Sequence, residues 1–211
     1  MNPVYWFFHC LANFLFWLGF RRKIHNGEIL EQYKDEGALL ASNHVSYLDP
    51  PLVGSTCKHT IYFLARKTLF RFKVSGWLFP RLHAIPVNQE RPDMASLRRI
   101  IRLVKAGKQV ALFPEGERTL DGKIKEAAPG TGLVIAKSKA LVIPMRIFGA
   151  YEAMPRGRSA VIRFTQVHLV VGQPFRFTEE ELAAATGREG YQLLANRVME
   201  EIGKIELPPP D

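Results

Sequence analysis

Short apolar runs alternate along the chain with longer amphipathic stretches, and this pattern predicts buried strands separated by helices. The predicted strands are Ala38–Asn43, Thr60–Ala65, Ala84–Val87, Gln109–Phe113, Leu141–Ile147 and one or two within Ala160–Val171. The predicted helices are Pro50–Thr56, Gly76–Leu82, Asp93–Lys105, Gly132–Lys139, Thr178–Ala185 and Tyr191–Ile205. The alternation predicts the α/β class: a single domain with a mixed, partly parallel sheet flanked by helices.

The N-terminal run, Val4–Phe20, has 14 apolar residues among 17, and 8 of them are aromatic. It predicts a helix capped by Asn2, with Pro3 at its first position. Such a helix spans roughly 26 Å at ~1.5 Å per residue, against a hydrocarbon core of ~30 Å. This length suits partial insertion into one membrane leaflet better than a full span. A buried core helix is the alternative, but a core helix seldom needs so many aromatic residues.

Basic residues extend this interpretation, because Arg21–Lys23 directly follow the apolar run. They suit contact with anionic headgroups and predict a place at the cytoplasmic face of the cell inner membrane or cytoplasmic membrane. A secretory signal does not fit, since the basic cluster follows the run instead of preceding it. The predicted division is a membrane-anchoring helix with a basic flank over 1–23, an α/β domain over 24–207 and a disordered tail over 208–211.

Composition and charge narrow the class of protein. The 211 residues are 47% hydrophobic and 23% charged, which excludes wholesale disorder, and the mean hydropathy of −0.06 excludes a polytopic membrane protein. The net charge is +9, and Lys58–Lys108 alone holds 12 basic and 2 acidic residues. Such a stretch can meet nucleic acid, an anionic membrane, phosphorylated substrates or acidic proteins. No recognisable nucleic-acid-binding motif accompanies it, so nucleic acid is the least favoured partner.

Two polar loops follow predicted strands, where ligand sites collect in open α/β sheets. The first loop, 42–49, contains His44 five residues before Asp49. A histidine whose second ring nitrogen is held by a carboxylate can take a proton from a hydroxyl group. The spacing lets the loop turn back so that the carboxylate meets the ring. Asp49 before Pro50 is also a natural helix N-cap, and the two roles can coexist.

The second loop, 113–119, combines turn residues with charged side chains. Pro114 and Gly116 predict a tight turn, and the guanidinium of Arg118 suits a phosphate group. Glu115 can accept a substrate hydroxyl or hold Arg118. A surface turn with an ion pair worth only ~0.3–0.5 kcal/mol is the alternative. The sequence contains no glycine-rich nucleotide motif, no zinc-protease motif and no hydrolase nucleophile elbow.

Taken together, the two loops resemble the 1-acyl-sn-glycerol-3-phosphate acyltransferase family of glycerolipid acyltransferases. The similar segments are, in order, Asn43-His44-x-Ser46-x-x-Asp49, Lys67-x-Leu69-Phe70, Gly76-Trp77, Ile85-Pro86-Val87, Phe113-Pro114-Glu115-Gly116-x-Arg118-Thr119 and Val142-Ile143-Pro144. The resemblance covers roughly Ala38 to Arg146, about half of the chain, and the order and spacing agree with the family. It also implies an α/β domain with an apolar N-terminal anchor.

The resemblance implies an enzyme that moves a fatty acyl group from an acyl carrier protein or coenzyme A thioester to the sn-2 hydroxyl of 1-acyl-sn-glycerol 3-phosphate. The product is phosphatidic acid, in phospholipid biosynthesis. His44 is the implied general base and Asp49 orients it, and neither a metal nor another cofactor is implied. The implied partners are the acyl carrier, the lysophosphatidate acceptor and anionic membrane lipid. The implied substrate-binding residues are Asn43, Ser46, Lys67, Arg91, Glu115, Gly116, Arg118 and Thr119.

The sequence departs from the family pattern at three places. The basic residue usual after the Ile-Pro-Val strand appears as Gln89, with Arg91 two residues on. Glu117 replaces a small residue, and Ala128 stands where many members have a lysine. The acceptor therefore stays open between lysophosphatidate and glycerol 3-phosphate, another lysophospholipid or a lyso-aminolipid. A non-catalytic peripheral membrane-binding protein is the alternative from a different class.

Overall fold

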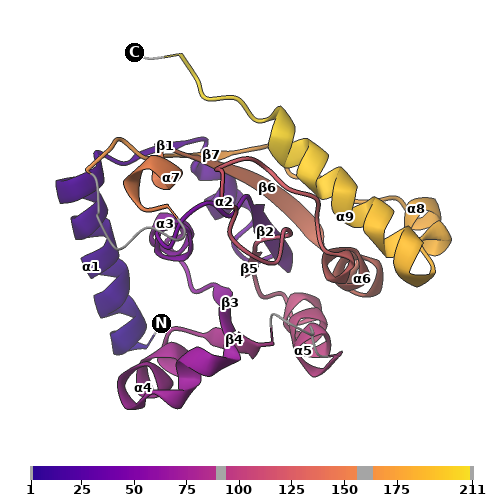
Figure 1. Cartoon of the computed structure of the whole chain (residues 1–211). Helices are drawn as coiled ribbons and strands as arrows, with labels where there is room; N and C mark the ends of the chain where they lie inside the picture. The colour runs from indigo at the N-terminus through magenta and orange to yellow at the C-terminus, as the bar shows by residue number, and fades with distance from the viewer. Residues whose placement is uncertain (1, 89–93, 156–163, 210–211) are drawn as a thin grey trace.

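The computed structural model describes residues 2–88, 94–155 and 164–209. Its sheet has the strand order β1-β7-β6-β2-β5-β3-β4 (Figure 1). The strands are β1 Lys23–His25, β2 Ala38–Ser42, β3 Tyr62–Arg66, β4 Ala84–Val87, β5 Val110–Leu112, β6 Leu141–Phe148 and β7 His168–Val171. The five strands from β6 to β4 are parallel, whereas β7 is antiparallel to β6 and parallel to β1. The predicted mixed, partly parallel sheet is confirmed.

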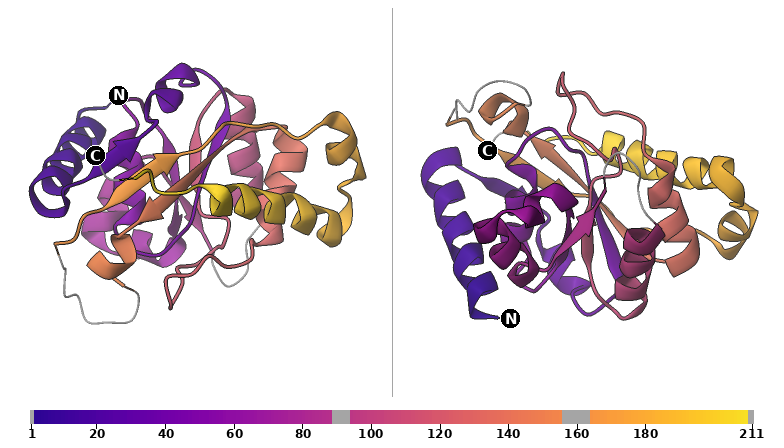
Figure 2. Two further views of the ribbon diagram at one scale, coloured as in Figure 1. Left: turned by 90° about the horizontal axis from the view of Figure 1, so that it is seen from above. Right: turned by 60° about the horizontal axis from the view of Figure 1, so that its bottom comes forward.

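Helices cover both faces of this sheet (Figures 1 and 2). They are α1 Pro3–Phe20, α2 Glu28–Gln32, α3 Asp49–Thr56, the 3-10 helix η1 Lys67–Arg71, α4 Lys73–Arg81, α5 Met94–Lys105, α6 Pro129–Ser138, α7 Ala150–Ala153, α8 Glu179–Ala184 and α9 Gly187–Lys204. Alternate residues of β2 enter separate cores, Leu40 with α1 and α3, and Leu39 with α5, α6 and α9. All five residues of β2 are therefore buried, which explains its uninterrupted apolar sequence.

Most predicted elements are confirmed, with shifted ends. Four helices begin earlier than predicted: α3 at Asp49, α4 at Lys73, α6 at Pro129 and α9 at Gly187. The predicted cap at Asp93 and the first part of the predicted strand region 160–171 lie outside the described residues, and β7 occupies its end. In the predicted tail, residues 208–209 form no helix or strand and residues 210–211 are not described. The elements that were not predicted, β1, α2, η1 and α7, have three to five residues each.

The N-terminal helix forms as the sequence predicts. The Asn2 side chain accepts a hydrogen bond from the amide of Tyr5, and Pro3 is the first helical residue. The helix ends where Arg21 adopts the left-handed conformation with φ 41°. By length and composition this helix could cross a membrane, and 17% of its residues are buried inside the protein. A helix of the protein core would be mostly buried, so α1 is not one. The division of the chain at residues 23 and 207 stays a prediction.

The close packing of α6 against α9 depends on a glycine. A Cβ atom on Gly132 would lie 1.8 Å from the carbonyl oxygen of Tyr191 in α9. The two backbones therefore approach more closely than any side chain allows. Gly203 in α9 provides the contrast, because a Cβ atom there would meet nothing within 4 Å.

We predict that Gly132→Ala lowers the free energy of unfolding by at least about 1–3 kcal/mol, because α6 must move away from α9. Gly203→Ala, the matched control, should raise it by up to about 1 kcal/mol through better helix propensity. Urea unfolding monitored by circular dichroism measures both values. Equal stability of the two variants would contradict the packing argument.

Candidate active site

The two polar loops begin side by side because their strands are paired. In the register of β2 and β5, Ala41 lies opposite Leu112. Both strands are parallel, so their carboxyl ends reach the same edge of the sheet. The first loop leaves β2 after Ser42 and leads into α3, and the second leaves β5 after Leu112. The sheet thus brings together two segments that are about 70 residues apart in sequence.

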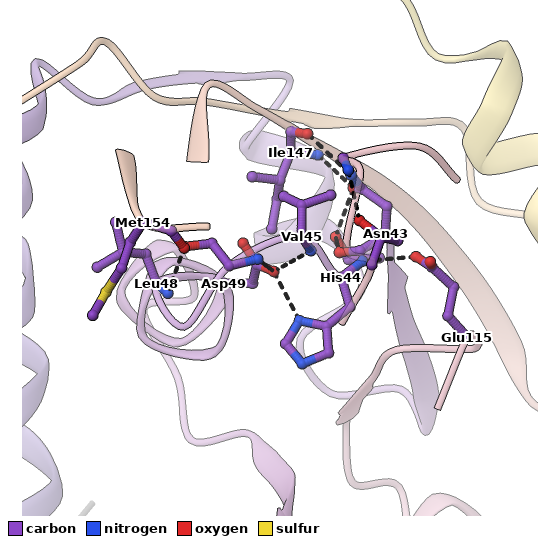
Figure 3. Close-up of polar contacts among 12 residues, drawn as sticks. Asn43, His44, Val45, Leu48, Asp49, Glu115, Ile147 and Met154 are labelled. Carbon is purple, nitrogen blue, oxygen red and sulfur yellow. Dashed lines mark hydrogen bonds and ion pairs between the residues drawn. The ribbon is translucent and has the colours of Figure 1, made fainter. Parts of the chain in front are cut away.

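The contact expected between His44 and Asp49 is present. The Nδ1 atom of His44 lies 2.8 Å from Oδ2 of Asp49, which is completely buried (Figure 3). The same oxygen accepts hydrogen bonds of 2.7 Å from the amides of Val45 and Ser46. Burial raises the pKa of the Asp49 carboxyl, although these contacts oppose the increase. Asp49 is the first residue of α3, and the N-cap position that it was expected to hold belongs to Leu48.

The imidazole of His44 is fixed on two sides. Its ring stacks on Phe113, with 4.0 Å between ring centroids and 16° between planes. When Asp49 is ionised, its carboxylate accepts a hydrogen bond from the Nδ1–H group of His44. The ring proton is then on Nδ1, which leaves Nε2 as the basic nitrogen. Nε2 makes no hydrogen bond to any described residue, and the side chain is 14% exposed. The arrangement presents one basic ring nitrogen to an incoming group.

The backbone of His44 joins the two loops. Its amide donates a 2.8 Å hydrogen bond to Oε1 of Glu115, and its carbonyl oxygen accepts a 2.9 Å bond from the amide of Thr119. The other oxygen of Glu115 accepts from the amide of Lys125 at 3.3 Å. Glu115 is nearly buried, and burial raises the pKa of its carboxyl to about 7. Glu115 therefore works as a clamp that places His44 relative to the second loop.

Arg118 stacks on a residue of the first loop. Its guanidinium carbon lies 3.3 Å from the centroid of the Tyr47 ring, and that ring is largely exposed. A stacked guanidinium directs its N–H donors outward in its own plane, which suits binding of a phosphate or carboxylate. Arg118 is half-buried, with its Nη1 atom enclosed, so its positive charge is held against the first loop.

Three of the predicted substrate-binding residues face the protein interior. The amide group of Asn43 donates to the carbonyl of Ile147 and its Oδ1 accepts from the amide of the same residue, at 3.1 and 2.7 Å. The hydroxyl of Ser46 donates to the carbonyl of Met154, and Oγ1 of Thr119 accepts from a nearby amide. These side chains hold the loops in place, and their substrate contacts stay a prediction.

The remaining predicted residues are not all gathered at the site. Lys67 is exposed at the start of η1 and makes no hydrogen bond or ion pair within the described ranges. Gly116 is exposed in a turn with φ +76°, a conformation that favours glycine, and its amide donates to the carbonyl of Phe113. Arg91 lies outside the described residues.

Sequence reasoning missed two aromatic contributors. Phe113 supports the His44 ring and Tyr47 supports Arg118. Both aromatic residues lie within the two polar loops, but no role was predicted for them. The only signal was their position beside the polar residues.

Across residues 2–88, 94–155 and 164–209, no three His, Cys, Asp or Glu side chains gather into a group that could hold a metal ion.

Comparison with known proteins relates this arrangement to a family. The acyltransferase family model matches residues 21–148. A chloroplastic 1-acyl-sn-glycerol-3-phosphate acyltransferase of Arabidopsis thaliana is 27% identical over 156 residues, which are 73% of this chain and 44% of that protein. A 1-acyl-sn-glycerol-3-phosphate acyltransferase of Bacillus subtilis is 27% identical over 186 residues, or 87% of each protein. This chain spans less than half the length of the chloroplast relatives.

A solved structure supports the fold. The crystal structure of the 1-acyl-sn-glycerophosphate acyltransferase of Thermotoga maritima matches with a TM-score of 0.73 and 24% sequence identity, over 97% of this chain and 81% of that one. The family model extends from just before β1 to the end of β6 and includes both site loops. Because it covers more than half of the sequence, the chain belongs to the acyltransferase family.

Proposed function

We propose that the protein transfers a fatty acyl group from an acyl thioester to the sn-2 hydroxyl of 1-acyl-sn-glycerol 3-phosphate. The observation that carries this proposal is the His44–Asp49 contact, which fixes the imidazole and leaves Nε2 open. Family membership and the names of the similar proteins support the same acceptor. The product is phosphatidic acid, so the reaction belongs to phospholipid biosynthesis.

The reaction needs only a base that later acts as an acid. Nε2 of His44 takes the proton of the acceptor hydroxyl as its oxygen attacks the thioester carbonyl. Asp49 stabilises the imidazolium through Nδ1. When the tetrahedral intermediate collapses, the C–S bond breaks and Nε2 returns the proton to the departing thiolate. An ester and a free thiol result, and His44 is neutral again.

The charge at the site suits the phosphate of the acceptor. The guanidinium of Arg118 is stacked on Tyr47 of the first loop. It can bind a phosphate group through two parallel hydrogen bonds. The donor is an acyl carrier protein or coenzyme A thioester, and the basic stretch Lys58–Lys108 suits either acidic carrier.

The acceptor lipid implies a membrane, and α1 fits this requirement. Its exposed residues form one apolar face: Pro3, Trp6, Phe7, Cys10, Leu11, Phe14, Leu15, Trp17 and Leu18. Its polar side chains face the protein instead. His9 contacts the carbonyl of Gly54, and Arg22 bridges Asn13 and Ser55 with hydrogen bonds of 2.7 Å. We propose that the apolar face lies in one leaflet at the cytoplasmic face of the membrane.

We predict that His44→Ala lowers kcat by at least about a hundredfold, because the proposed base for the acceptor hydroxyl is lost. Asp49→Asn should also lower kcat about a hundredfold or more by disturbing the histidine tautomer. The assay is release of free thiol from an acyl thioester in the presence of lysophosphatidate. His168→Ala is the control, because that histidine pairs with His25 away from the site. Full activity of natively folded His44→Ala would disprove the base assignment.

Phosphate binding by Arg118 predicts a separation of kinetic constants. Arg118→Ala should raise the KM for lysophosphatidate about tenfold or more, since one charge-assisted contact is lost, and should change the KM for the acyl donor much less. Arg188→Ala, which removes an exposed arginine near the start of α9, is the control. Equal effects of Arg118→Ala on both substrates would refute this role.

The clamp residue Glu115 predicts a pH effect on stability. Its folded-state pKa of about 7 exceeds the ordinary value of 4.5. The folded state therefore binds the proton more tightly, and this stabilisation disappears as pH rises from the ordinary pKa through the folded one. Relative to Glu115→Gln, the natural protein should lose up to about 3 kcal/mol of unfolding free energy over this range. Urea unfolding of both proteins at a series of pH values tests this, and parallel curves would contradict it.

A further inference from the structure

Residues 67–81, comprising η1 and α4, form a segment with several large, exposed apolar side chains. Neither element contains a buried residue. The exposed fractions of Phe72, Val74 and Trp77 are 67%, 76% and 52%. A lone exposed apolar side chain is ordinary, but several of them grouped on one segment mark an interaction surface.

The segment is ordered by its own contacts. Phe70 and Phe79 meet edge to face with 5.5 Å between their centroids. Arg81 lies 4.3 Å above the Trp77 ring and donates to the carbonyl of that residue. A Cβ atom on Gly76 would lie 2.6 Å from the carbonyl oxygen of Phe70, so the glycine allows α4 to fold against η1. The apolar face is thus presented on a fixed framework.

The charge of the segment selects the kind of partner. Residues 67–81 contain four basic residues and no acidic one. Lys67, Arg71 and Lys73 are exposed, and none forms an ion pair with any acidic side chain in the described residues. Exposed aromatic rings among cations fit the headgroup region of an anionic bilayer, where rings enter the boundary and cations meet phosphates.

The segment adjoins both the N-terminal helix and the candidate site. The side-chain amide of Asn2 donates a 2.9 Å hydrogen bond to the carbonyl of Arg81, and Figure 1 shows the start of α1 beside α4. η1 begins directly after β3, whose neighbour β5 ends in the second site loop. The exposed face of α1 therefore has a neighbouring apolar and basic surface near the same edge of the sheet.

We propose that residues 67–81 dock on the anionic surface of a bilayer as a second contact, independent of α1. Phe72, Val74 and Trp77 enter the headgroup boundary, and Arg71, Lys73 and Arg81 contact lipid phosphates. Two separate contacts fix the orientation of the domain, which one helix cannot do. This inference rests on the proposed function only in that the acceptor is a membrane lipid.

The test is sedimentation of the full chain with vesicles of phosphatidylcholine, with and without phosphatidylglycerol, in the absence of substrate. Phe72→Ser should lower the partition coefficient roughly tenfold on the anionic vesicles. Leu193→Ser on α9 is the matched control, because the two side chains are 67% and 71% exposed. Lys73→Glu should lower binding to anionic vesicles about fivefold, and this decrease should be smaller at high salt. Lys108→Glu should leave binding to the same vesicles unchanged.

Activity on a soluble short-chain lysophosphatidate separates this inference from the proposed function, and Phe72→Ser should keep that activity. Absence of turnover in the natural protein would overturn the function and leave the vesicle result standing. Equal binding by Phe72→Ser and Leu193→Ser, or equal binding by Lys73→Glu and Lys108→Glu, would overturn the docking surface. If Phe72→Ser and Lys73→Glu bound vesicles as the natural protein does but had a raised KM for an acyl carrier protein donor, the docking surface would also be overturned. The surface would then be assigned to binding of an acidic protein.

Discussion

The backbone of one residue, His44, holds the candidate site together. The amide of His44 donates to Glu115 and its carbonyl accepts from Thr119, so the imidazole takes its position from both loops at once. This arrangement depends on the parallel pairing of β2 and β5, which starts the two loops at adjacent points. The imidazole then needs only Asp49 and Phe113 to fix its rotation. Sheet register, rather than local loop conformation, therefore sets the geometry of the proposed chemistry.

Much of the fold could be predicted because the sheet is covered on both faces. Full burial gives β2 and the first five residues of β6 a mainly apolar sequence that is easy to recognise. The edge strand β1 has three residues, none of them buried, and the helices α2 and α7 are only five and four residues long. None of these elements is long enough to show a period. The start of α6 lies earlier than predicted because its first residues, Pro129 and Gly130, have weak helix propensity. Tertiary contacts outweigh that propensity.

The sequence predicted which loops meet at the candidate site better than it predicted the contacts of each side chain. His44, Asp49 and Arg118 are polar residues after strands, and their spacing is visible in sequence. The partners of Asn43 and Ser46 are backbone groups 104 and 108 residues away, which no local pattern reveals. Similarly, Glu115 could be read as a ligand to substrate, because only its burial and its two amide donors show that it connects loops. Long-range contacts thus decide which polar residues are free to meet a substrate.

The inward-facing polar side of α1 has a consequence for any attempt to shorten the chain. Apolar N-terminal helices are commonly trimmed from such proteins to obtain soluble material. Here trimming before residue 22 would strip Asn13 from Arg22 and uncover the flank of α3 that carries Gly54 and Ser55. Because α3 begins with Asp49, the helix proposed to meet the lipid is also a brace for the carboxylate that holds the imidazole of His44. Greater solubility would come at the expense of the site itself.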